Sequence, residues 1–205
     1  GGGGGRPGPT IVDINSGFMR DDEGLVMIYE GAEGEALFTA EEYKFYGDVI
    51  ERIRRTVGAE NGLDEGFPVF TAPTFITRIK YDADWRPRSM HDVYWLPHVD
   101  KNNTGHYDYS GLLYLSTHGS DFLGSMFEFV SLSDEETAEQ RVEPRRGRLV
   151  SFTAGNENPH RLNIIEGGTR FVLSFWFSCD REKEFRTFLD GKSHTSFDAH
   201  RPDEL

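Results

Sequence analysis

Cysteine is almost absent from this chain. Cys179 is the single cysteine among 205 residues. An intramolecular disulfide needs two cysteines and a thiolate zinc cluster needs several, so both are excluded. A domain of this length can bury enough apolar surface to fold without such cross-links. The cysteine count therefore leaves the cellular compartment open.

Long apolar runs and positive charge are also scarce. No run of apolar residues approaches the roughly 20 that a membrane-spanning helix needs. Acidic residues number 35 and basic residues 22, which gives a net charge of −13 and a pI near 4.9. Because such a surface repels phosphate groups, we expect no nucleic acid partner and no direct membrane contact. A basic substrate is compatible with this charge.

The chain opens on five glycines, without an initiating methionine or a signal peptide. We expect residues 1–10, rich in Gly and Pro, to form a flexible lead outside the fold. The folded domain is expected at residues 11–190, followed by a polar C-terminal tail at residues 191–205. This start is consistent with a piece of a longer protein, whose upstream anchor would lie outside the sequence.

One strong helical pattern occurs near the N-terminus. Thr39-Ala40-Glu41-Glu42 resembles a capping box, and apolar residues then recur at helical spacing from Tyr43 to Val57. Gly58 is the expected stop. The pattern predicts a helix that packs one face against a sheet and exposes its charged face. A second, short helix is expected at residues 180–189.

The remainder, from Phe67 onward, is rich in short strand-like segments. We expect strands at residues 74–81, 110–116, 122–130 (with a turn), 148–152 and 170–177, and a strongly acidic loop at residues 131–141. Many short strands after one helix are typical of a double-sheet jelly roll. The predicted fold is therefore mostly β with supporting helices, around a double-stranded β-helix core.

Four residues in this β-rich part suggest a metal site. In an extended segment His98 and Asp100 project to the same side while Val99 projects away. His160 follows a loop-like segment, and Arg170 opens an apolar strand. Two imidazoles and one carboxylate suit a divalent first-row metal and leave coordination positions open. Arg170 offers a fixed fork of donors that matches a carboxylate.

Each of these residues also has an ordinary interpretation. A His-x-Asp triplet is often surface charge or a local hydrogen-bonded pair, a buried histidine is often a core residue, and an arginine is often a surface ion-pair partner. The ordered set of all four, each beside strand-like sequence, favours the metal site. A related alternative is a cupin-like site that holds zinc or manganese.

Several further segments carry a family resemblance. They are His98-Val99-Asp100, Tyr114-Leu115-Ser116, Phe122-Leu123-Gly124, the run from Pro144 to Phe152, His160 and Arg170. In this order they resemble the prolyl 4-hydroxylase-like branch of the iron(II)/2-oxoglutarate dioxygenases, over residues 15–179. One departure is Ser125, since relatives often have a second glycine after Gly124.

The resemblance implies a cofactor set and a role for each site residue. Iron(II) would be held by His98, Asp100 and His160, which are also the catalytic residues. Arg170 would bind the far carboxylate of the cosubstrate 2-oxoglutarate, with Tyr114, and Tyr81 as a weaker candidate. Dioxygen is the other reactant, and ascorbate is a candidate further cofactor.

The implied reaction hydroxylates a C–H bond of a protein or peptide side chain and releases succinate and CO₂. The alternatives are a sensing module that binds metal and 2-oxoglutarate without turnover, and a hydroxylase of a non-protein substrate. We expect the loops at residues 82–88, 101–107 and 131–141 to border the cleft. Their mixed charge selects no particular substrate, and the oligomeric state is left open.

The resemblance also implies a lumenal domain of the secretory pathway, in the endoplasmic reticulum or Golgi, behind a single-pass anchor. Asn102-Asn103-Thr104 is an N-glycosylation sequon, which is usable only in that compartment. The terminal Pro202-Asp203-Glu204-Leu205 differs from the Lys-Asp-Glu-Leu retention signal by its proline. It is either a retention signal or an acidic tail.

Overall fold

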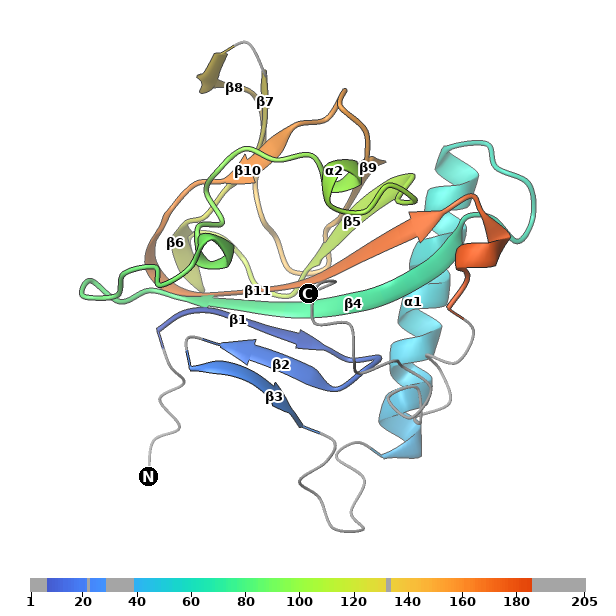
Figure 1. The fold of residues 1–205 in the computed structure, drawn as a ribbon, viewed down its shortest axis with the longest axis horizontal. Helices are drawn as coiled ribbons and strands as arrows, with labels where there is room; N and C mark the ends of the chain where they lie inside the picture. The colour runs from blue at the N-terminus through green and yellow to red at the C-terminus, as the bar shows by residue number, and fades with distance from the viewer. Residues whose placement is uncertain (1–6, 22, 29–38, 132–133, 186–205) are drawn as a thin grey trace.

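Two β-sheets face each other, and one long helix covers the outer face of the larger sheet (Figure 1). The computed structural model describes residues 7–21, 23–28, 39–131 and 134–185. The larger sheet has the order β3-β2-β1-β4-β11-β5-β9, with β6 paired to one end of β11, and the smaller sheet has the order β10-β7-β8. This arrangement confirms the predicted jelly roll, mostly β with supporting helices.

The elements have the following bounds. The larger sheet contains β1 (Gly8–Asp13), β2 (Phe18–Asp21), β3 (Gly24–Met27), β4 (Val69–Lys80), β5 (Tyr109–Tyr114), β6 (Phe122–Gly124), β9 (Leu149–Thr153) and β11 (Ile165–Ser178). The smaller sheet contains β7 (Phe127–Ser131), β8 (Asp134–Val142) and β10 (His160–Leu162). The helices are α1 (Ala40–Glu60), α2 (Asp100–Asn103) and the 3₁₀ turns η1 (Met90–Asp92) and η2 (Arg181–Lys183).

Strand β11 is an interior strand of the larger sheet, between β4 and β5. Its side chains alternate between the two faces, as the pleat of a strand requires. Arg170, Val172, Ser174 and Trp176 line a cavity between the two sheets. Leu173, Phe175 and Phe177 point the other way, into the core beneath α1. One strand therefore carries both the floor of the cavity and the main hydrophobic core.

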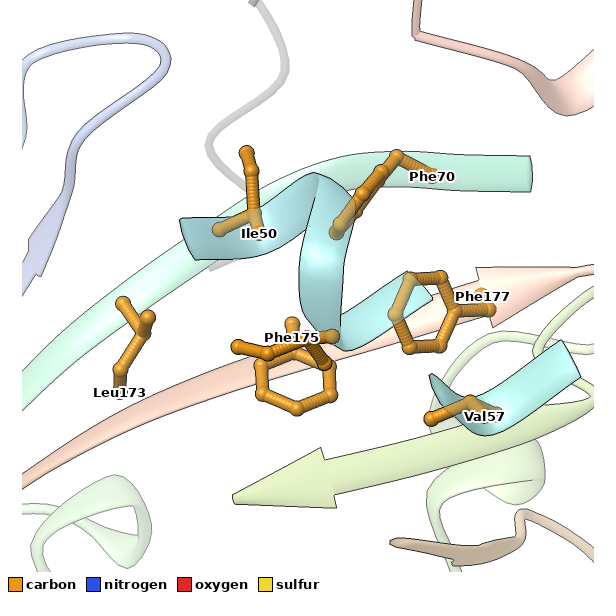
Figure 2. Packing of buried hydrophobic residues seen from close by; sticks show 7 residues of the cluster. Ile50, Val57, Phe70, Leu173, Phe175 and Phe177 are labelled. Atoms are coloured by element: carbon orange, nitrogen blue, oxygen red, sulfur yellow. The ribbon is translucent and has the colours of Figure 1, made fainter. Parts of the chain in front are cut away.

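Helix α1 forms as predicted and packs on the outer face of the larger sheet. Its capping box is complete, since Thr39 Oγ1 accepts from the Glu42 amide and the Glu42 carboxylate accepts from the Thr39 amide. Figure 2 shows Ile50 and Val57 of α1 against the phenylalanines of β11. The helix ends at Glu60 rather than at Gly58. Gly58 lies within the helix against the Phe67 carbonyl, where a Cβ would be 2.5 Å from the oxygen, so this glycine permits close packing and does not end the helix.

The expectation that residues 8–10 lie outside the fold is wrong. Strand β1 begins at Gly8 and pairs along β4, with Gly8 opposite Lys80. Gly8 has φ +79° and lies under the Trp85 ring, so a larger residue does not fit there. Pro9 is tolerated because β2 pairs only with a later part of β1. Residues 1–6 and the predicted tail at 191–205 lie outside the described residues.

Two further expectations need correction. The acidic segment expected as a loop contains strand β8, which pairs only with β7 and is thus an edge strand, where charged side chains are usual. Instead of a helix over residues 180–189, the described part of that segment holds the short turn η2, and residues from 186 on lie outside it. No helix of the described residues is long and apolar enough to cross a membrane.

The Gly124-Ser125 departure lies at a turn between β6 and β7. Gly124 has φ +70° and Ser125 has φ 49°, so both occupy the left-handed region that glycine adopts most readily. Ser125 is fully buried, and its hydroxyl has no hydrogen-bond partner among the described residues. The turn therefore keeps the backbone conformation of a glycine pair although the second residue is a serine.

Candidate active site

Three predicted metal ligands converge between the two sheets. The nearest ligand atoms of His98, Asp100 and His160 all lie within 4.8 Å of one another. The Nε2 atoms of His98 and His160 are each 3.8 Å from an oxygen of Asp100. This spacing fits three atoms arranged around one ion. His160 and Asp100 are buried, whereas the His98 side chain is 43% exposed, so the site opens on the His98 side.

The backbone places His98 and Asp100 differently from the predicted strand. His98 makes a single bridge to His160, through two amide–carbonyl hydrogen bonds of 2.9 and 3.0 Å, and Asp100 begins α2. Val99 between them is extended, with φ −125° and ψ 124°. His98 and Asp100 therefore project to the same side as predicted, but by one extended residue and not by a regular strand.

Hydrogen bonds fix the orientation of both imidazole rings. Nδ1 of His98 lies 3.2 Å from the Leu96 carbonyl, and Nδ1 of His160 lies 2.9 Å from the Asn158 carbonyl. A carbonyl only accepts, so each Nδ1 carries a proton, and in the neutral imidazole it is Nε2 that keeps the free lone pair. Outer partners of this kind hold a histidine in the tautomer that binds metal.

His160 is also held in its neutral form. Burial lowers its pKa to about 4, assisted by the nearby His98 and opposed by the Asp100 carboxylate and the Asn158 carbonyl. The ring lies between Phe127, stacked at 5.1 Å, and Phe152, edge-on at 4.9 Å. At neutral pH His160 therefore needs no deprotonation before it binds a metal.

Arg170 is a buried cation without an anionic partner among the described residues. It is 1% exposed, and its Nε and Nη2 atoms have no hydrogen-bond partner. The guanidinium carbon lies 5.5 Å from the ring centroid of Tyr114, which is fully buried and whose hydroxyl also lacks a partner. Burial lowers the pKa of Arg170, and the two tyrosines Tyr114 and Tyr94 act against that change. An unpaired buried charge is costly, so these groups fit an absent anion.

The triad and Arg170 line the same cavity, which has a volume of about 170 Å³. Its walls include three polar residues that the sequence analysis did not single out: Tyr94, Ser110 and Trp176. Ser110 and Trp176 lie opposite each other on β5 and β11, and Ser110 Oγ and Trp176 Nε1 lack partners among the described residues. Their inward position follows from strand alternation with Arg170, a signal present in the sequence once the register is known.

Residues 88–178 match the family model of the 2OG-Fe(II) oxygenase superfamily. The chain carries a 2OG-Fe(II) oxygenase domain. Over 180 residues it is 37% identical to human 2-oxoglutarate and iron-dependent oxygenase domain-containing protein 3, covering 87% of this chain and 54% of that protein. It spans about half of the length of this curated relative.

Shorter and more distant likenesses accompany this match. Prolyl 3-hydroxylase 2 of Gallus gallus is 40% identical over 73 residues, which cover 36% of this chain and 10% of that protein. The crystal structure of a 2OG-Fe(II) oxygenase family oxidoreductase from Burkholderia pseudomallei superposes with a TM-score of 0.46 at 17% identity, covering 61% of this chain and 49% of that one.

The site residues of the oxygenase domain fit the groups that its family implies, Fe(II), 2-oxoglutarate and O₂. Two imidazole nitrogens and a carboxylate form a three-ligand set that suits iron(II) and leaves positions open. The buried guanidinium, with orphaned nitrogen atoms, fits the far carboxylate of a dicarboxylate. The three-ligand set and the buried guanidinium therefore both fit these groups.

Two of the predicted positions lie outside the cavity of the oxygenase domain. Tyr81 is 42% exposed and does not line the cavity, so the structure does not bring it to the predicted cosubstrate position. The chain leaves the sheet after Lys80, where β4 ends, and this turns Tyr81 toward solvent. Asn102 is exposed on α2, and its glycosylation stays a prediction.

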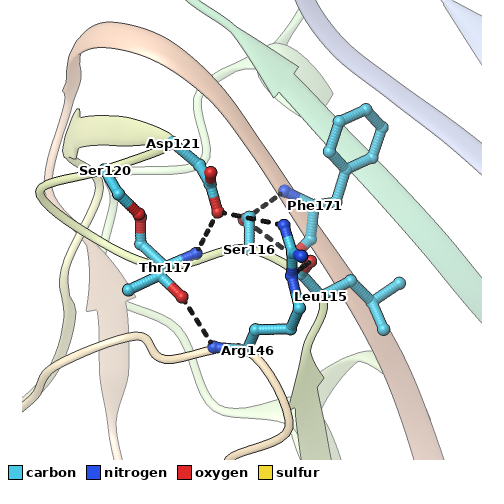
Figure 3. A network of polar contacts seen from close by, with 7 residues as sticks. All are labelled: Leu115, Ser116, Thr117, Ser120, Asp121, Arg146 and Phe171. Atoms are coloured by element: carbon cyan, nitrogen blue, oxygen red, sulfur yellow. Dashed lines mark hydrogen bonds and ion pairs between the residues drawn. The ribbon is translucent and has the colours of Figure 1, made fainter.

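A polar network fixes the strand ends behind Arg170 (Figure 3). Ser116 Oγ accepts from the Phe171 amide at 2.8 Å and donates to the Phe171 carbonyl at 3.2 Å. The Leu115 amide also donates to this carbonyl, so backbone and side chain together extend the pairing beyond the end of β5. Asp121 accepts from the Thr117 amide at 2.7 Å and pairs with Arg146 at 3.4 Å. These contacts hold the backbone next to Arg170 in the oxygenase domain.

Proposed function

We propose that this domain is an iron(II)- and 2-oxoglutarate-dependent dioxygenase that hydroxylates a C–H bond. The observation that carries the proposal is the buried Arg170, with unpartnered nitrogens, in the same cavity as a His–Asp–His triad. A metal site alone would fit several metalloproteins. A buried cation facing the same cavity adds a position for a chelating dicarboxylate. A simple zinc site would not need this position, whereas a sensing module that binds 2-oxoglutarate would.

The two ends of the cavity would have different roles, one in binding the metal and the other in binding the cosubstrate. His98, Asp100 and His160 would hold the iron, with the rings preset by the Leu96 and Asn158 carbonyls. Arg170 would orient the cosubstrate by its far carboxylate, and Tyr114 would donate to the same group. When bound, iron, 2-oxoglutarate and dioxygen supply the oxidising chemistry, which couples decarboxylation to succinate and CO₂ with hydroxylation. On the His160 side, the rings of Phe127 and Phe152 would limit the access of water.

A protein or peptide side chain is the substrate that we propose. The support is the likeness over 73 residues to prolyl 3-hydroxylase 2, whose name describes action on a prolyl residue. The opening at the exposed His98 gives a side chain access to the metal position. Mass spectrometry of a denatured protein extract treated with the enzyme should reveal peptides heavier by one oxygen atom. Oxidation confined to free small molecules would contradict a protein substrate.

Anaerobic titration of iron(II) and then 2-oxoglutarate into the purified domain tests the proposal. We expect a weak visible charge-transfer band when the cosubstrate chelates the iron. In Arg170→Gln the half-saturating concentration of 2-oxoglutarate should rise roughly 100-fold or more, because loss of one partner of a buried charge pair costs about 2–5 kcal/mol. Arg86→Gln, on the exposed segment after Tyr81, is the matched control and should bind normally.

Turnover separates the enzyme from the sensing alternative. With oxygen added, the wild-type domain should convert 2-oxoglutarate to succinate slowly even without a substrate, and Asp100→Ala should abolish this conversion. Iron binding without a charge-transfer band would reject the dioxygenase proposal. A band without any succinate, in the presence of candidate substrates, would favour the sensing module.

A further inference from the structure

Tyr94 lines the cavity, but neither the metal triad nor the pair of Arg170 and Tyr114 accounts for its presence there. It belongs to the segment between η1 and His98 and packs against the buried cluster of Ile79, Phe122 and Ile165. That cluster lies at the Arg170 end of the cavity, because Ile79 is the direct partner of Arg170 across β4 and β11. Tyr94 therefore reaches from the metal-binding segment to the end that would bind the far carboxylate.

The Tyr94 hydroxyl has one fixed contact and one unused proton. Its oxygen accepts a hydrogen bond of 3.2 Å from the Ile165 amide. A phenol can accept and donate at once, so the proton is left for another acceptor. Among the described residues the Tyr94 hydroxyl donates no hydrogen bond. Tyr94 lines the cavity and lies close enough to Arg170 for each to influence the charge state of the other.

We propose that Tyr94 donates this proton to the far carboxylate of the dicarboxylate cosubstrate, beside Arg170 and Tyr114. The inference rests on the proposed function and extends it to a residue not assigned by the sequence. A carboxylate has about four acceptor positions, and an arginine fork fills two of them. Two positions are then left, which matches the two phenols at this end of the cavity, Tyr94 and Tyr114.

The Ile165 contact makes this arrangement rigid. Ile165 begins β11, five residues before Arg170, so its amide fixes the phenol oxygen relative to the strand that carries the guanidinium. Tyr94 is also four residues before His98, on the same segment. The metal ligand and the carboxylate donor would thus be set at a constant separation. A site of this kind should select a dicarboxylate by its length.

Tyr94→Phe tests the proposal with Tyr81→Phe as the matched control, since Tyr81 carries the same hydroxyl outside the cavity. Each variant is titrated anaerobically with iron(II) and then with 2-oxoglutarate or pyruvate, followed by the charge-transfer band. Pyruvate chelates through the same 2-oxo acid group but has no far carboxylate. The dissociation constant for 2-oxoglutarate should rise about tenfold or more in Tyr94→Phe, the range for a hydrogen bond to a charged group. That for pyruvate should stay unchanged, and Tyr81→Phe should match the wild type for both.

Three outcomes would overturn the inference. Unchanged 2-oxoglutarate binding in Tyr94→Phe would show that the hydroxyl does not contact the cosubstrate. An equal loss for 2-oxoglutarate and pyruvate would show a distorted cavity, and thus a role in packing only. If the wild-type domain forms no band with either ligand, the proposed function itself fails and takes the inference with it, a result distinct from the first two.

Discussion

At the scale of single residues, both histidines of the triad follow a proline and make the same local contact. In Leu96-Pro97-His98 and Asn158-Pro159-His160, the imidazole Nδ1 meets the carbonyl two residues before it. Proline fixes its own φ near −65° and keeps the preceding residue extended. The repeated unit therefore presets both rings before a metal binds. It is visible in the sequence, although its meaning depends on the bridge between the two histidines.

Replacement of Pro159 by alanine should loosen the His160 ring without removing any ligand. The Asn158 carbonyl remains, but its position is less restricted, so the affinity for iron(II) should fall by several-fold, less than the roughly 10- to 100-fold seen when an outer partner is lost. Anaerobic calorimetric titration with iron(II) measures this change. Pro87→Ala, at an exposed proline, is the control. Equal affinities in Pro159→Ala and the wild type would contradict the argument.

At the scale of elements, two buried carboxylates anchor neighbouring segments, and their pKa values are shifted in opposite directions. Asp13 ends β1, is fully buried, and accepts from Ser16, Asn15 and Thr74, yet burial raises its pKa above the ordinary value. Burial acts on Asp92 in η1 in the same way, but amide donors from Arg88 and Ser89 and the charge of Arg20 lower its pKa overall. Asp92 thereby ties the segment that carries Tyr94 to β2.

The free energy of unfolding should therefore depend on pH with opposite sign at these two residues. The contribution of Asp92 is complete above the unfolded pKa, near 3.9, and is lost as pH falls through the lower folded pKa. That of Asp13 is complete below the unfolded pKa and declines as pH rises toward the raised folded pKa. Urea unfolding from pH 3 to 7 checks this. The stability difference between wild type and Asp92→Asn should grow with pH, and that between wild type and Asp13→Asn should shrink. Slopes of the same sign would contradict the assignment.

The elements also show where sequence patterns were sufficient and where they were not. The capping box at Thr39 and the apolar alternation of β11 depend on local chemistry, and both were predictable. The strand character of Asp134–Val142 was not, because its charges suit an edge position that only the pairing with β7 reveals. The same limit separates Tyr81 from Tyr94. Both are tyrosines upstream of His98, and only the path of the intervening loop decides which one enters the cavity.

At the scale of the whole molecule, one face of β11 contributes to the stability of the core and the other face lines the candidate active site. Its odd-numbered side chains Leu173, Phe175 and Phe177 form the core with α1, while Arg170, Val172, Ser174 and Trp176 line the cavity. The two sets of side chains share a backbone but point to opposite sides of the sheet, so substitutions on one face should have little effect on the property of the other. Arg170 is the extreme case, since it is a buried charge without an ion-pair partner among the described residues.

Arg170→Met should accordingly raise the stability of the ligand-free domain while it abolishes cosubstrate binding. A buried charge left unpaired destabilises the fold, and replacement of buried ionic groups by apolar ones of similar volume often gains about 1–4 kcal/mol. Ile50→Val in α1 should do the converse, with a loss of about 0.5–1.5 kcal/mol and unchanged 2-oxoglutarate titration. Urea midpoints at constant m-value and the charge-transfer titration measure both properties. A clear loss of stability in Arg170→Met would show that the guanidinium is part of the structural core, and the cavity would then lack the unpaired cation on which the cosubstrate site depends.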